Sequence, residues 1–239
     1  MIRDPLQEVL DAALRTPDAT APGAVDPSTL TALRLARRRF GVALPPPFVA
    51  VPAEPARLPL RPAGPTDGPA IAAVQRRAWR VRYRGLIADA FLDGLDFSYL
   101  GGYWTGRATV SPSPRHRLLV AGPPGEVHGV VDTGPARDDD ARVAADGTVL
   151  TGEVRSLYVD PSVFGRGLGS ALLHAAEGAL ATAGFTAGAV LWVVEGNAGA
   201  RAFYERWGWA PDGARKVTPV DDERLDEVRY SHQGSSRDR

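Results

Sequence analysis

The chain has 239 residues with 28 basic and 28 acidic side chains, so its formal net charge of zero gives no argument for binding nucleic acid or an anionic membrane. It contains no cysteine, which excludes disulfides, thiolate metal sites and a cysteine nucleophile. The four histidines are scattered without HxxxH or HExxH spacing, so we expect no metal site.

The first residues lack the pattern of a targeting segment. Asp4, Glu8 and Asp11 interrupt the stretch where a signal peptide would need an apolar core. No window approaches the ~18 apolar residues of a membrane span, so we expect a cytoplasmic protein. Arginine is far commoner than lysine, of which Lys216 is the single example, and this bias is typical of a GC-rich bacterial genome.

Residues 1–55 are predicted to form a helical extension and a proline-rich linker. Asp4-Pro5 and Asp26-Pro27 each place a capping side chain before a proline, as at the start of a helix, and apolar residues follow at helical spacing. Prolines then recur between residues 45 and 65 and exclude a helix there. The other predicted boundaries are a domain over residues 56–232 and a disordered tail over 233–239.

Strand and helix patterns alternate along the larger domain. This alternation in the second half predicts βαβ connectivity, and adjacent strands before it make the sheet mixed and partly parallel, an α/β (α+β) fold with flanking helices. The expected elements in chain order are a strand at 57–63, a helix at 68–86, a short helix and a loop within 91–106, a hairpin of strands at 115–122 and 126–134, an acidic loop at 136–147, a strand at 152–160, a helix at 167–183, a strand at 188–194, a helix at 197–208 and a strand at 226–232.

A glycine-rich turn, "VFGRGLGS" at residues 163–170, follows the strand at 152–160. A P-loop would need a lysine here, and a Rossmann turn would need glycine where Ser170 stands and an acidic residue about 20 positions on. The pyrophosphate of coenzyme A fits better, because it needs a strand, a turn of free N–H groups and a helix N-terminus. A plain tight turn into a helix is the alternative.

The segment "LYVDPSVFGRGLGSALL" resembles the signature [Q/R]-x-x-G-x-[G/A] of the GNAT superfamily of N-acetyltransferases. Downstream, "VLWVVEGNAGARAFYERWGW" is similar to the next strand and helix of that family, and the resemblance covers residues 57–232. It implies a GNAT-like acyl-CoA fold with an N-terminal helical extension, and acetyl-CoA as co-substrate. Phe164 departs from the signature, which has Gln or Arg at this position.

The resemblance assigns residues 153–160 and 190–195 to two parallel strands that separate around the pantetheine arm. Backbone N–H groups near Leu157 and Val159 would bind the acyl carbonyl; on their own, these residues indicate only a buried strand. The implied cofactor-binding residues are Leu157, Tyr158, Val159, Gly165, Arg166, Gly167, Leu168, Gly169, Ser170 and Asn197. Asn197 equally fits a helix cap.

Two side chains are candidates for proton transfer. Tyr204, in the "FYER" that resembles the family's Phe-Tyr-Glu, would protonate the departing thiolate, whereas core packing is its ordinary interpretation. Glu153 would accept the amine proton, directly or through water, and its alternative is an exposed strand glutamate. Glu195 is a second choice, or a carboxylate that binds the acceptor.

The acceptor is expected to lie opposite the cofactor, near the first helices and the "GGYWTG" loop. Trp79, Tyr83, Tyr103 and Trp104 are candidate walls, or simply pack the helices on the sheet. We predict acetyl transfer to the primary amine of a small molecule, by direct attack in a ternary complex, with no nucleic acid or membrane partner and with homodimerisation left open. The alternatives are a protein acetyltransferase acting on lysines or N-termini, and a non-catalytic acyl-CoA-binding regulatory module.

Overall fold

The computed structural model describes residues 24–25, 49–50, 58–94, 98–220 and 223–233, and the chain divides into two compact units, Met1–Ala56 and Arg57–Arg239. In the first unit, β1 (Ala24–Val25) pairs in parallel with β2 (Val49–Ala50). The two helices predicted within residues 1–55 and the predicted disorder of residues 234–239 lie outside the described residues. No helix in the described part of the chain is long and apolar enough to cross a membrane.

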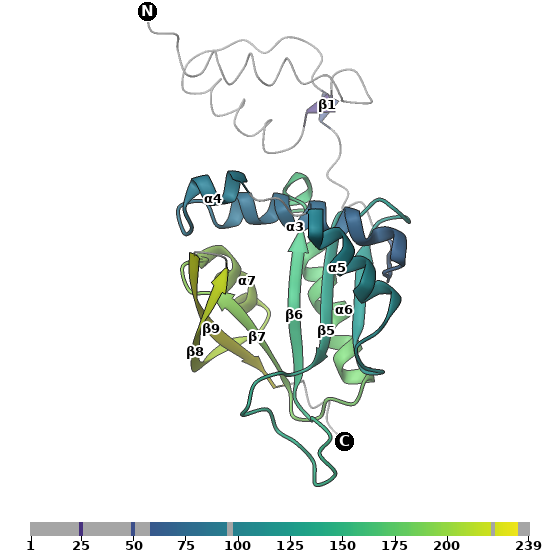
Figure 1. Ribbon diagram of the computed structural model, residues 1–239, viewed down its shortest axis with the longest axis vertical. Coiled ribbons are helices and arrows are strands. Elements are labelled where there is room, and N and C mark those ends of the chain that lie inside the picture. The colour runs from purple at the N-terminus through teal and green to yellow at the C-terminus, as the bar shows by residue number, and fades with distance from the viewer. Residues whose placement is uncertain (1–23, 26–48, 51–57, 95–97, 221–222, 234–239) are drawn as a thin grey trace, which may run out of the picture. The chain divides into compact units, whose positions relative to one another are not determined.

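The second unit is built on a seven-stranded mixed sheet of order β3-β4-β5-β6-β7-β9-β8 (Figure 1). Every neighbouring pair is antiparallel except β6 and β7, which are parallel. The strands are β3 (Leu60–Pro62), β4 (Arg117–Ala121), β5 (Gly129–Pro135), β6 (Gly152–Val159), β7 (Ala189–Val194), β8 (Ala210–Val220) and β9 (Glu223–His232). The predicted partly parallel sheet and the β4–β5 hairpin are confirmed.

Helices cover both faces of the sheet. One face carries α3 (Gly68–Arg82), α4 (Asp89–Gly94) and α5 (Ser98–Thr109), and the other carries α6 (Leu168–Thr182) and α7 (Ala198–Arg206). Short 3₁₀ turns, η1 (Pro65–Asp67) and η2 (Pro161–Val163), precede α3 and α6. The stripe predicted for α6, namely Leu168, Leu172, Ala176 and Leu180, is buried against the sheet.

The sequence interpretation of the "GGYWTG" segment as a loop is wrong, because it lies within α5. The glycines of this segment favour a loop by local propensity, but tertiary packing outweighs that preference. At Gly68 an added Cβ would come within 2.7 Å of the Gly101 carbonyl oxygen and 2.6 Å of the Thr105 nitrogen. The backbones of α3 and α5 therefore approach each other as closely as glycine allows, and this packing favours the helix over the loop.

A β-bulge lies in the middle of β6. Asp132 and Thr133 are consecutive on β5, yet they pair with Ser156 and Val154, so Arg155 is an extra residue. Val154, Leu157 and Val159 consequently all join the hydrophobic cluster beneath α6, whereas Tyr158 joins the cluster beneath α3 and α5. The bulge changes the alternation of side chains just where β6 stops pairing with β7.

Candidate active site

The β6–β7 pair is joined at one end only. Its ladder consists of Gly152–Ala189, Glu153–Val190 and Val154–Leu191, after which β6 continues to Val159 and β7 to Val194 without further pairing. We call the unpaired part, residues 155–159 and 192–194, the fork; in Figure 1 the two arrows diverge there.

Two backbone N–H groups of β6 point into the fork. The N–H of Asp160 donates to the His128 carbonyl (2.8 Å), and Tyr158 is paired with Val130 on the same side. Because successive N–H groups of a strand alternate in direction, those of Leu157 and Val159 point away from β5, toward the side that β7 has left. The backbone groups of Tyr158, by contrast, are used in the β5 ladder.

The glycine turn lies at the end of the fork. Gly165 and Gly167 have φ of +74° and +80°, in the left-handed region that L side chains rarely adopt, and no atom lies within 4 Å of a Cβ added to either. The first bond of α6 runs from the Ala171 N–H to the Gly167 carbonyl (3.0 Å). The N–H groups of Leu168, Gly169 and Ser170 thus lack helical partners.

Asp160 fixes the position of this turn. Its Oδ1 accepts hydrogen bonds from the Ser162 N–H (2.9 Å) and hydroxyl (2.7 Å), and its Oδ2 accepts one from Arg77 Nε of α3 (2.8 Å). The strand, the turn and α3 are therefore linked through one buried carboxylate.

Three phenols, at the C-cap of α3, on β6 and on α7, are near enough to influence one another. They belong to Tyr83, Tyr158 and Tyr204, and burial raises the pKa of each, with a further contribution from a neighbouring phenol for Tyr83 and Tyr204. Tyr204 is 9% exposed and its hydroxyl makes no hydrogen bond to any described residue. It is therefore a protonated phenol at neutral pH whose proton is not donated elsewhere in the described chain.

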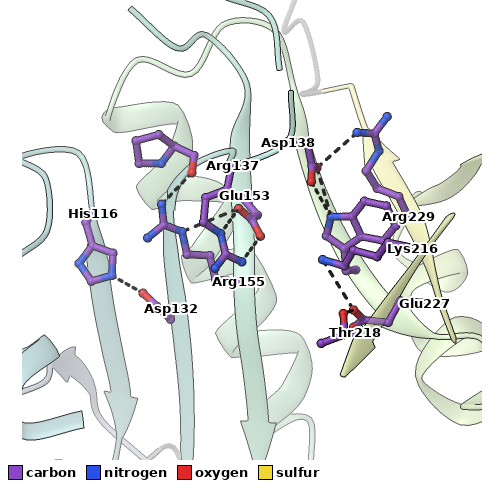
Figure 2. Close-up of polar contacts among 12 residues, drawn as sticks. His116, Asp132, Arg137, Asp138, Glu153, Arg155, Lys216, Thr218, Glu227 and Arg229 are labelled. Atoms are coloured by element: carbon purple, nitrogen blue, oxygen red, sulfur yellow. Dashed lines mark hydrogen bonds and ion pairs between the residues drawn. The ribbon is translucent and has the colours of Figure 1, made fainter. Parts of the chain in front are cut away.

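Glu153 is buried at the closed end of the β6–β7 pair, not exposed. Its two carboxylate oxygens accept hydrogen bonds from Arg137 Nε (2.9 Å) and Nη2 (2.6 Å), and Arg155 Nε lies 3.8 Å away. Figure 2 shows both guanidinium groups around this carboxylate, with Asp132 and His116 beside them. The Arg137 side chain is 61% exposed, so only the carboxylate of the pair is shut away from water.

Other predicted site residues have structural partners. Asn197 caps α7, accepting from the Ala200 N–H (3.1 Å), and Glu195 is held by two hydrogen bonds from Arg215 (2.6 and 2.8 Å) at the surface. Trp104 is 2% exposed and donates to Gln75 Oε1 (2.8 Å), so it lies in the core beneath α3 and α5. Trp79 of α3 and Tyr83, the C-cap residue of that helix, meet edge to face with their ring centroids 5.0 Å apart.

Glu227 is a carboxylate that the sequence reasoning missed. It lies on β9 opposite Val194, accepts from the Thr218 hydroxyl and is 3.6 Å from Lys216 Nζ, which in turn lies over the Trp192 ring (Figure 2). Its charge raises the pKa of both Tyr83 and Tyr158, so it belongs to the surroundings of the fork. Only the strand pairing of β9 with β7 and β8 reveals this position.

A small cavity of about 150 Å³ lies at the closed end of the β6–β7 pair rather than at the fork. Arg229 lines it and forms ion pairs with Asp138, Asp140 and Asp212. The cavity is lined by Ala136, Asp138, Asp140, Ala141, Thr151, Ala187, Val190 and Arg229. The described residues contain no group of three His, Asp or Glu side chains that could hold a metal ion.

Comparisons with solved structures give the same fold. A ribosomal-protein-alanine N-acetyltransferase from Brucella melitensis is 23% identical with a TM-score of 0.52, over 73% of this chain and 99% of that one. An N-acetyltransferase from Staphylococcus aureus Mu50 is 18% identical with a TM-score of 0.53, over 74% and 98%. An acetyltransferase-type protein of Salmonella typhimurium, solved with its cofactor acetyl-CoA, is 21% identical with a TM-score of 0.52, over 75% and 95%. These likenesses establish the fold alone.

No curated protein matches the sequence. Residues 96–209 match the model of the acetyltransferase (GNAT) family, and they include the fork, the glycine turn and Tyr204. By this match, the part of the chain that holds the forked parallel pair is similar to acetyltransferases of the GNAT family.

Proposed function

We propose that the protein transfers an acetyl group from acetyl-CoA to the primary amine of a small molecule, by direct attack in a ternary complex. The observation that carries this proposal is the fork: two N–H groups without strand partners, ending at a glycine turn whose N–H groups also lack helical partners. An elongated ligand with an amide-rich arm and phosphates at one end matches that arrangement.

The residues of the fork fit an acyl-CoA. The N–H groups of Leu157 and Val159 would bind the pantetheine arm and the acyl carbonyl, and residues 165–170 would bind the pyrophosphate, since a Cβ at Gly165 or Gly167 would occupy open space there. Acetyl-CoA supplies an acetyl group activated as a thioester. The Salmonella protein's complex with acetyl-CoA supports this choice of ligand.

The chain's own groups would stabilise the charges that develop during transfer. A preorganised N–H group of Leu157 or Val159 would stabilise negative charge on the acyl oxygen without reorganising water. Tyr204 would donate its proton to the departing sulfur, because burial keeps the phenol protonated and its hydroxyl has no other partner in the described chain.

Glu153 would accept the proton of the attacking amine, directly or through water. In the present arrangement both of its oxygens are bonded to Arg137. We infer that a bound amine displaces Arg137, whose exposed side chain can turn into water. Trp79 and Tyr83 would line the acceptor side, whereas Trp104 packs in the core and Glu195 is bonded to Arg215.

The test is a calorimetric titration of the full chain with acetyl-CoA, with free CoA and NAD as comparators. Micromolar binding of acetyl-CoA without binding of NAD is expected. A panel of small amines, with a peptide bearing a free N-terminus and one bearing lysine, would then be screened for thiol release. Absence of acetyl-CoA binding would contradict the proposal; release only with the peptides would replace the small-molecule acceptor by a protein.

A further inference from the structure

Phe164, the residue that departs from the family signature, contacts an arginine from another element. The guanidinium carbon of Arg82, the last residue of α3, lies 4.1 Å from the centroid of the Phe164 ring. A guanidinium over an aromatic face is attracted by the ring quadrupole and loses little of its hydrogen-bonding capacity at its edge. Phe164 therefore holds a cation at the start of the glycine turn.

Arg82 also reaches the element that follows the other strand of the fork. Its Nη1 lies 3.4 Å from the position of a Cβ added at Gly199, in the first turn of α7. The guanidinium thus lies between the turn that follows β6 and the helix that follows β7. This is the open end of the fork, where the glycine turn has its free N–H groups.

The charge of Arg82 is not neutralised within the described chain. Arg82 is exposed and makes no hydrogen bond or ion pair with any described residue; Arg166 in the turn is half-buried and likewise makes none. Arginines elsewhere in the domain commonly have carboxylate partners: Arg61, Arg77, Arg84, Arg107, Arg137, Arg215 and Arg229.

The positive charges of Arg82 and Arg166 lie near the N-termini of α6 and α7, where the helix dipoles place further partial positive charge. These like charges repel one another when no anion is bound. An anion between them removes that repulsion. The five N–H donors of a guanidinium suit phosphate oxygens in particular.

We propose that Arg82, held by its stacking on Phe164, binds a phosphate group of acyl-CoA and replaces the polar side chain that the signature carries at position 164. This inference rests on the proposed function, because the phosphate belongs to the same co-substrate. The phosphate chemistry has two sources in acyl-CoA, the pyrophosphate and the 3′-phosphate of the ribose.

The test compares Arg82→Met with Arg76→Met by calorimetric titration with acetyl-CoA at two ionic strengths. Arg76 is the matched control, an exposed arginine of the same helix without a described partner. We expect Arg82→Met to weaken binding about tenfold and to reduce its salt dependence, and Arg76→Met to bind as the wild type does. Equal binding by both variants would overturn the inference.

Dephospho-CoA separates the two phosphate sources. If Arg82→Met weakens the binding of dephospho-CoA as much as that of CoA, the pyrophosphate is the partner of Arg82. If Arg82→Met and the wild type bind dephospho-CoA equally well, the 3′-phosphate is the partner. Either result supports the inference. Failure of the wild type to bind acetyl-CoA would overturn the proposed function and this inference with it. Normal binding by the wild type and by both variants would overturn this inference alone.

Phe164 is tested in the same assay. Phe164→Leu keeps an apolar residue of similar size but removes the aromatic face, and we expect a loss of a few fold, with a thermal melt to verify folding. Adding Phe164→Gln to Arg82→Met restores a signature residue and is expected to recover part of the lost affinity. Unchanged binding by Phe164→Leu would refute the stacking role.

Discussion

The two ends of the β6–β7 pair differ in whether their polar groups have hydrogen-bond partners. At the closed end, Glu153 has both oxygens bonded to Arg137, and Asp138 and Asp140 are paired with Arg229. At the open end, the N–H groups of Leu157 and Val159 face away from β5, beyond the last β6–β7 pair. A buried polar group without a partner costs free energy, so the fork is held open by the packing around it and is completed when a ligand supplies the missing partners.

The largest expected effect comes from Tyr204→Phe at the open end. The change removes one hydroxyl that has no described partner, so the melting temperature and acetyl-CoA affinity are expected to stay unchanged while turnover falls about 100-fold or more. Tyr230→Phe is the matched control, because its hydroxyl donates to Glu205 (2.7 Å) and accepts from Arg201 (3.1 Å). It should lower stability and leave turnover intact; steady-state kinetics and melts of both variants decide.

At the closed end, the two partners of one ion pair are expected to differ. Arg137→Met leaves the Glu153 carboxylate, 2% exposed, without its main partner and should cost about 3 kcal/mol of unfolding free energy. Glu153→Gln leaves Arg137 free to turn into water and should cost about 1 kcal/mol. Denaturant titrations measure both, and equal losses would mean that the burial of the carboxylate does not govern the pair.

Gly167→Val tests the turn at the open end. Valine at φ +80° is strained by about 1–2 kcal/mol, and its side chain would occupy the space assigned to the phosphates, so both stability and acetyl-CoA affinity should fall. Gly178→Ala, at an exposed position inside α6 with nothing within 4 Å of the added Cβ, should raise stability and leave affinity unchanged. Normal affinity in Gly167→Val would remove the turn from the cofactor site.

The smallest expected effect concerns a fully satisfied carboxylate far along the chain from the fork. Asp67 accepts hydrogen bonds from Arg61 and from the N–H groups of Gly64 and Gly125, and the Arg61 guanidinium lowers its pKa well below the usual range. A carboxyl with a lowered folded pKa stabilises the fold above its unfolded pKa of about 4, and this stability is lost as the pH falls toward the folded pKa.

Asp67→Asn should therefore melt at a lower temperature than the wild type at pH 7, with a smaller further loss below about pH 4. Asp139→Asn, at an exposed aspartate with no described contact, is the control and should follow the wild-type curve. Parallel melting curves for Asp67→Asn and the wild type from pH 7 to pH 2 would contradict the expected contribution.

The sequence was sufficient for elements whose local pattern agrees with their packing. The helix at α6 and the strands β4, β5, β6 and β7 were predicted because their apolar periodicity matches their buried faces. Strand β8 was missed because Pro211, Gly213 and Pro219 interrupt its pattern. An edge strand tolerates these residues, and β8 has a register shift between Pro211 and Arg215.

For the candidate site, the sequence predicted the residues that lie within local motifs. It did not predict the contacts that those residues make with distant segments of the chain. The left-handed turn at Gly165 and Gly167 follows from local glycine spacing. The Arg137–Glu153 pair joins β6 to the segment that follows β5, 16 positions away, and the contact between Arg82 and Phe164 joins α3 to the turn. Such partners depend on strand register and helix packing, which no short pattern encodes.

The extra residue in β6 leaves a trace that can be found in related sequences without any structure. Apolar residues of one face stand at Val154, Leu157 and Val159, so one interval is three residues long where an unbroken strand would have two. A gain or loss of a single residue before Leu157 would exchange the faces of the following side chains. A relative whose β6 is one residue longer or shorter before this point would therefore need the three-residue interval at a correspondingly shifted position. A sequence alignment that places a gap inside the interval would assign the wrong residues to the binding side.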